Sequence, residues 1–181
     1  MSIHIIFGFL LALFGVSAGC HDNSYAAPIV MGHIVFPQDI PKDLMITLER
    51  TGCFGACPIY KLTITADGKV VFKGGRFVKQ EGATKKSAIS QERLKQLIAE
   101  FERVQFFSLE DDYVTNRRVC DELWTDNPSA FTSLRINGKS KTIKHDYGCR
   151  GPKVPKELTE LENKIDEIAN TEQWLPDRKG R

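Results

Sequence analysis

The sequence predicts an α+β fold, in which an antiparallel sheet built from β-hairpins carries two amphipathic helices packed on one face. Two observations lead to this class. Period-two alternation of apolar residues surrounds two hairpin dipeptides, Asp67-Gly68 and Asn137-Gly138. After each hairpin, apolar residues recur at helical spacing, and a helix with one apolar face must bury that face against another element. Because both halves follow this order, we also consider a degenerate two-fold repeat.

The strands are expected where alternation is clearest. In the first half, residues 44–50 and 60–65 alternate, and residues 69–73 return as the partner strand. Residues 76–79 are expected to continue this ladder beyond a bend at Gly74-Gly75.

The second half repeats the hairpin. Residues 130–136 and 141–145 are expected to pair around their own turn, and residues 148–152 form a loop. Residues 110–128, between the two halves, are polar and are expected to be irregular.

Each half is expected to end in a helix followed by an aromatic closure. Ser90 is a suitable N-cap for the first helix, and Pro155 suits the first turn of the second. The inward face of the first helix is expected to consist of Leu94, Leu97, Ile98, Phe101 and Val104. That of the second is expected to consist of Leu158, Leu161, Ile165 and Ile168. Phe106-Phe107 and Trp174 then close the two halves.

The N-terminal residues have the composition of an export signal. Residues 5–16 are almost entirely apolar, too short a run to span a bilayer but suited to the central region of a signal peptide. Residues 16–20, V-S-A-G-C, resemble a bacterial lipobox, in which Cys20 would be diacylated and become the mature N-terminus. Cleavage near residues 24–27, which would discard Cys20, is the competing interpretation, because Ser17 stands where an aliphatic residue is usual.

The expected organisation follows from this leader. Residues 1–19 are assigned to the signal peptide, 20–43 to a tether, 44–175 to one α+β domain and 176–181 to a polar tail. By analogy with bacterial lipoproteins, His21 after the cysteine predicts an outer-membrane lipoprotein that faces the periplasm. A soluble periplasmic or secreted protein is the alternative.

Composition and motifs restrict the function without naming it. The formal net charge is +2, which gives no reason to expect a nucleic-acid partner. The chain contains no Ser-His-Asp, HExxH, P-loop or GxGxxG pattern. We therefore expect a non-enzymatic protein and assign no catalytic residue, cofactor or metal.

The cysteines agree with export. Five cysteines are present, and committing Cys20 to lipid leaves Cys53, Cys57, Cys120 and Cys149, an even set for an oxidising compartment. Four cysteines allow three pairings, and sequence spacing does not choose among them.

The C-x-x-x-C-P run at residues 53–58 has two interpretations. It matches locally the motif of thioredoxin-fold copper chaperones, with His145 available as a third ligand, since thiolates and imidazole suit copper. In that fold a helix begins at the second cysteine, whereas here the residues after Pro58 alternate with period two. We therefore favour a short disulfide that constrains a loop between two strands. A thiol-redox or copper site at Cys53 and Cys57 remains the alternative.

The same region carries a family resemblance. Residues 48–60, L-E-R-T-G-C-F-G-A-C-P-I-Y, resemble a bacterial domain of unknown function, number 6438, whose hallmark is L-x-R-T-x-C-F-G-x-C-P-x-Y followed by a hairpin with a DG-type turn. The resemblance extends over residues 44–175 and includes segments 74–78, 125–128, 137–139, 146–148, 161–166 and 171–174. It implies an exported or envelope-associated domain with no assigned activity.

The resemblance also bears on the cysteines. Where the family commonly runs from T-D-L-P to Y-x-G-A-P, this chain has Asn127 and, at residues 148–152, G-C-R-G-P. Cys120 and Cys149 therefore resemble an added pair, which implies bonds Cys53–Cys57 and Cys120–Cys149.

The leading functional hypothesis is a lipid-anchored, disulfide-stabilised binding or structural domain of the cell envelope. Its expected partners are the membrane, through the lipid on Cys20, and another protein or an envelope polymer.

Overall fold

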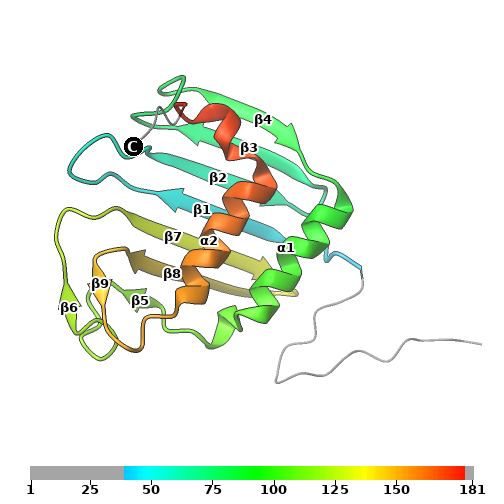
Figure 1. Cartoon of the computed structure of the whole chain (residues 1–181). Coiled ribbons are helices and arrows are strands. Elements are labelled where there is room, and N and C mark those ends of the chain that lie inside the picture. The colour runs from blue at the N-terminus through cyan, green and yellow to red at the C-terminus, as the bar shows by residue number, and fades with distance from the viewer. Residues whose placement is uncertain (1–38, 178–181) are drawn as a thin grey trace, which may run out of the picture.

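The computed structural model describes residues 39–177, and the segments predicted to be the signal peptide, the lipidated Cys20 and most of the tether lie outside this range. One open sheet carries two helices on one of its faces (Figure 1). In spatial order its strands are β4 (Thr84–Ala88), β3 (Lys69–Gly74), β2 (Tyr60–Thr65), β1 (Met45–Arg50), β7 (Ser129–Ile136), β8 (Lys139–Asp146) and β5 (Asp112–Tyr113). A separate two-stranded ribbon pairs β6 (Glu122–Leu123) with β9 (Cys149–Arg150). The α+β class is confirmed.

The helices lie where the apolar periodicity predicts them. Helix α1 is Gln91–Arg103, and the Ser90 side chain caps it by accepting a hydrogen bond from the Arg93 N–H at 3.3 Å. Helix α2 is Lys156–Ala169, and the short helices η1 (Phe106–Ser108) and η2 (Thr171–Trp174) follow α1 and α2. Every residue expected on the two inward faces is buried. No helix within residues 39–177 is long and apolar enough to cross a membrane.

The two hairpins are joined through β1, which pairs antiparallel with β2 on one side and with β7 on the other. The turn at Asn137-Gly138 has φ of +52° and +72°, as a two-residue hairpin turn of the favoured type requires. Alternate strand residues such as Ile46, Leu62 and Leu134 are fully buried beneath the helices. Their neighbours, which include Thr47, Lys61 and Ser133, line the face that the helices leave open.

Three segments of the chain differ from the sequence-based expectation. Residues 76–79 do not extend the ladder: Phe77 has a φ of +59° and belongs to a loop, and the chain re-enters the sheet only at β4. The sequence T-K-K-S-A of β4 shows no apolar alternation, because an edge strand has few apolar neighbours to face. The connector 110–128 and the loop 148–152, both expected to lack strands, contribute two-residue strands. β5 pairs parallel with β8, and β6 pairs antiparallel with β9.

Strand direction places four connections at one end of the sheet. β1, β3 and β8 end there, while β2, β4 and β7 begin there. We call this the loop end; its connections are residues 51–59, 75–83, 124–128 and 147–148, on the left in Figure 1. The described chain enters β1 from the opposite end.

Candidate functional site

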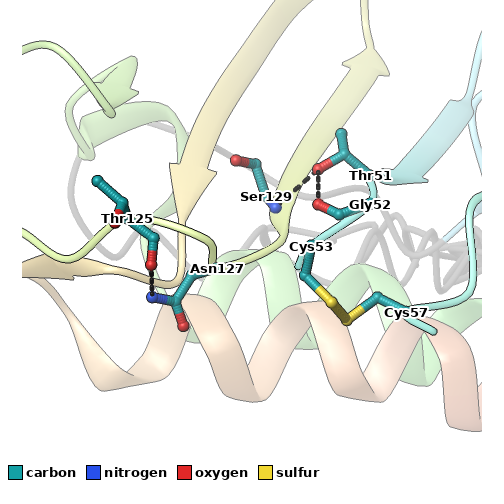
Figure 2. The surroundings of a disulfide bond; sticks show 7 residues. All are labelled: Thr51, Gly52, Cys53, Cys57, Thr125, Asn127 and Ser129. Atoms are coloured by element: carbon teal, nitrogen blue, oxygen red, sulfur yellow. Dashed lines mark hydrogen bonds between the residues drawn. A yellow bond between two sulfur atoms is a disulfide. The ribbon is translucent and has the colours of Figure 1, made fainter. Parts of the chain in front are cut away.

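The disulfide loop, residues 51–59, lies at the centre of the loop end. Cys53 and Cys57 are bonded, with their Cα atoms 5.6 Å apart (Figure 2). The Thr51 N–H donates to the Ser129 carbonyl at 2.9 Å, and the Ser129 N–H donates to Thr51 Oγ1 at 2.8 Å. Gly55 at the tip has a φ of +135°, a conformation that favours glycine, and open space beside its Cα. The base of the loop is therefore fixed to β7, whereas Gly55 at its tip faces open space.

Neighbouring connections support the disulfide loop on both sides. The Phe54 N–H donates to the Asp126 carbonyl at 3.1 Å. On the other side, Ile59 donates to the Arg76 carbonyl at 2.9 Å and accepts from the Gly75 N–H at 2.7 Å. The three connections thus form one continuous surface rather than separate loops.

This surface concentrates exposed aromatic side chains. Within residues 39–177 three large hydrophobic side chains are classed as exposed, namely Phe54 at 88%, Trp124 at 53% and Phe77 at 37%. Each belongs to one of those three connections. The Arg150 guanidinium lies 4.7 Å from the Trp124 ring centroid, and that of Arg76 lies 5.7 Å from the Phe77 ring centroid. We call these five residues the aromatic–arginine surface.

Beneath the loop, Asp166 of α2 holds the two residues that flank it. The Arg50 guanidinium donates to Asp166 Oδ2 through Nε at 3.1 Å and Nη2 at 2.8 Å. Asp166 Oδ1 accepts from the Tyr60 hydroxyl at 2.7 Å and from Thr171 Oγ1 at 3.0 Å. Burial would lower the pKa of Arg50, but the Asp166 carboxylate and its neighbours raise it above its ordinary value. The arginine therefore stays charged, and one carboxylate anchors the last residue of β1 and the first of β2.

A second group continues this network into the core. The Tyr147 hydroxyl donates to Glu162 Oε2 at 2.6 Å and accepts from the Arg50 guanidinium. His145 Nδ1 lies 3.1 Å from both Glu162 carboxylate oxygens, and the two side chains are 3% and 0% exposed. Burial, followed by the Glu162 charge, raises the pKa of Tyr147 above its ordinary value, so the phenol stays protonated and donates.

The structure separates the residues proposed for a copper site. Cys53 and Cys57 are joined to each other, while His145 of β8 is hydrogen-bonded to Glu162 of α2. No group of three or more His, Cys, Asp and Glu side chains that could hold a metal occurs among residues 39–177. Within that part of the chain, no third His, Cys, Asp or Glu ligand accompanies the two cysteines.

Cys120 and Cys149 are buried thiols in the structure. Burial, a hydrogen bond with Cys120 and the charge of that thiol raise the pKa of Cys149 to about 12. The Cys120 thiol also donates to the Glu122 carbonyl at 3.3 Å. The two side chains are therefore neighbours next to the β6–β9 ribbon, although no bond joins them.

Sequence reasoning did not find the network around Asp166 and Glu162. Both carboxylates lie on α2, four residues apart, and Glu162 falls four residues after the buried Leu158. The available signal was Glu162 itself, since an acidic residue at an inward helical position indicates a buried polar partner. Arg50 and Tyr60, the partners of Asp166, lie more than 100 residues away along the chain, which no local pattern reveals.

The fold and the site define a class: an open antiparallel sheet, covered by two helices on one face, that presents a disulfide-closed loop on a buried ionic network. Residues 44–169 match the family profile described as Domain of unknown function (DUF6438), and the chain belongs to this family. No curated protein matches the chain.

Proposed function

We propose that the protein is an exported, lipid-anchored, non-enzymatic envelope protein that binds another envelope protein through the aromatic–arginine surface. The observation that carries this proposal is the placement of the exposed aromatic side chains of the described domain on adjoining loops at one end of the sheet. Exposed apolar side chains gathered in this way are typical of interaction sites.

The chemistry of the surface favours a protein partner. Tryptophan and arginine are enriched among the residues that dominate protein–protein binding energy, and an aromatic ring adds a large contact area. Arg76 and Arg150 pair with aromatic rings rather than with carboxylates of the described chain, so their charges are available to a partner. The expected partner surface has apolar pockets bordered by acidic side chains.

The position of the surface agrees with an N-terminal anchor. The described chain enters β1 at the end of the sheet opposite the disulfide loop. If Cys20 is the lipidated residue, residues 21–38 span at most about 60 Å when fully extended. The aromatic–arginine surface would then face away from the anchored end of the domain, where a partner could reach it.

Lipidation is tested by metabolic labelling with a fatty-acid probe. We expect the full-length protein to incorporate the probe and to fractionate with membranes, and we expect a Cys20→Ser variant to do neither. Incorporation into the Cys20→Ser protein, or export of an unlabelled wild-type protein, would end this part of the proposal.

The contact surface is tested by a photo-crosslinking residue placed at position 54 in living cells. We expect one discrete protein adduct that disappears when Trp124→Ala or Arg150→Ala is added. The matched control carries the crosslinker at Lys139, which is exposed at the opposite end of the sheet. Adducts that are the same at both positions, that consist of lipid, or that survive both substitutions would contradict the proposal.

The proposal includes a second cross-link, between Cys120 and Cys149, in the exported protein. Mass mapping of non-reduced peptides is expected to recover Cys53–Cys57 and Cys120–Cys149, because neighbouring thiols in an oxidising compartment pair. Recovery of two free thiols at positions 120 and 149 would refute the second bond. An open Cys53–Cys57 pair together with copper uptake would instead support the thiol-redox or copper alternative.

A further inference from the structure

We propose that a pocket at the β4 edge of the sheet binds a small planar organic anion, a carboxylate attached to a flat apolar body. The pocket has a volume of about 190 Å³ and lies between the outer strands and η2. Its lining consists of Phe72, Lys79, Gln80, Lys85, Gln173 and Trp174. This inference is independent of the binding surface proposed above.

The wall of the pocket suits a flat apolar group. Phe72 and Trp174 lie with their ring centroids 4.8 Å apart, and Tyr60 stacks on Phe72 at 5.1 Å from beneath. Phe72 is only 1% exposed and belongs to the core, and the partly buried Trp174 packs against that core. A cavity of about 150 Å³ is large enough for benzene, so the pocket can accommodate one aromatic ring with a small substituent.

The polar lining suits a negative charge. The lining residues include Lys79 and Lys85, whose side chains carry ammonium groups, and Gln80 and Gln173, whose side chains carry amides; no Asp or Glu is among them. Charge-assisted hydrogen bonds to a carboxylate are stronger than bonds between neutral groups. The lining therefore distinguishes an anion from a neutral molecule of the same shape.

Lys85 is the residue whose charge would select an anionic ligand. It lies opposite Phe72 in the β3–β4 pairing, which directs its side chain to the helix-covered face of the sheet. Lys79 Nζ lies 3.2 Å from Asp177 Oδ1. No ion pair within residues 39–177 includes Lys85. An inward-pointing charge on an edge strand also discourages strand pairing between molecules, which is an alternative role for Lys85. The two roles differ in one respect: only a binding role requires the Lys85 charge to change the affinity for an anionic ligand.

The experiment compares benzoate with benzamide, which has the same shape without the charge. Binding is followed by calorimetry and by Trp174 fluorescence in a Trp124→Phe background, where Trp174 is the remaining tryptophan of the two in the chain. We expect saturable benzoate binding and at least about tenfold weaker benzamide binding, since a lost charge-assisted hydrogen bond is worth a factor of this order.

The decisive variants are Lys85→Met and its neighbour Lys86→Met. Lys85 faces the pocket, whereas Lys86, opposite Val71, points to the other face of the sheet. Both changes keep an unbranched side chain and remove one charge, and thermal melts of both variants show whether each is folded. We expect Lys85→Met to weaken benzoate binding about tenfold or more and Lys86→Met to leave it within about twofold. Absence of saturable benzoate binding, equal affinity for benzamide, or equal effects of the two substitutions would overturn the proposal.

Discussion

Replacing Asp166 with alanine is expected to lower the free energy of unfolding by about 3 kcal/mol, because it leaves the Arg50 charge without its partner in a largely buried position. The two side chains are 13% and 18% exposed, and Tyr60 and Thr171 would lose the same acceptor. Urea denaturation of the purified domain, with the midpoint and slope recorded, measures the change.

The matched control for Asp166→Ala is Glu49→Ala, which removes an ion pair from the residue beside Arg50. Glu49 lies on the open face of β1, 3.4 Å from Lys61, and both side chains are about half exposed. An exposed pair of this kind contributes about 1 kcal/mol at most. A third variant, Asp166→Asn, keeps the shape and removes the charge. Stability of Asp166→Asn within about 0.5 kcal/mol of the wild type would show that the charge does not anchor the loop.

Replacing Gly148 with alanine is expected to lower the free energy of unfolding by about 3 kcal/mol. This is the upper end of the usual cost of forcing an extra carbon atom into a packed site. A Cβ atom at Gly148 would clash with the Trp124 carbonyl oxygen, and a backbone atom cannot turn aside as a side-chain end can. The Trp124 N–H donates to the Gly148 carbonyl at 2.9 Å, so separating the two segments also breaks this hydrogen bond.

Because Trp124 belongs to the aromatic–arginine surface, Gly148→Ala is also expected to remove the crosslink at position 54. Gly52→Ala is the control within the same end of the sheet, since its Cβ would meet only the end of the Ile59 side chain, at 3.2 Å. We expect a loss of less than about 1 kcal/mol for that variant, measured by the same denaturation. Equal stabilities for the two alanine variants would contradict this prediction. They would show that the 124–128 segment can move away from Gly148 at no cost in stability.

The sequence by itself determined the elements whose signals are local. Alternation and two-residue turns located the hairpins around Asp67-Gly68 and Asn137-Gly138, and helical spacing located the buried faces of α1 and α2. The interpretation of Cys53–Cys57 as a short bond between two strands also rested on its neighbours, because the alternation after Pro58 excludes a helix there. The family follows from the same motif.

Only the tertiary structure decided how these elements meet. The edge strand β4 has few apolar neighbours, so its sequence lacks the pattern that reveals a strand. The contacts of Arg50 and Tyr60 with Asp166 cross more than 100 residues. The loops that carry the exposed Phe54, Phe77 and Trp124 adjoin only because strand direction brings three connections to one end. Such contacts depend on the order of strands in the sheet, which no local pattern carries.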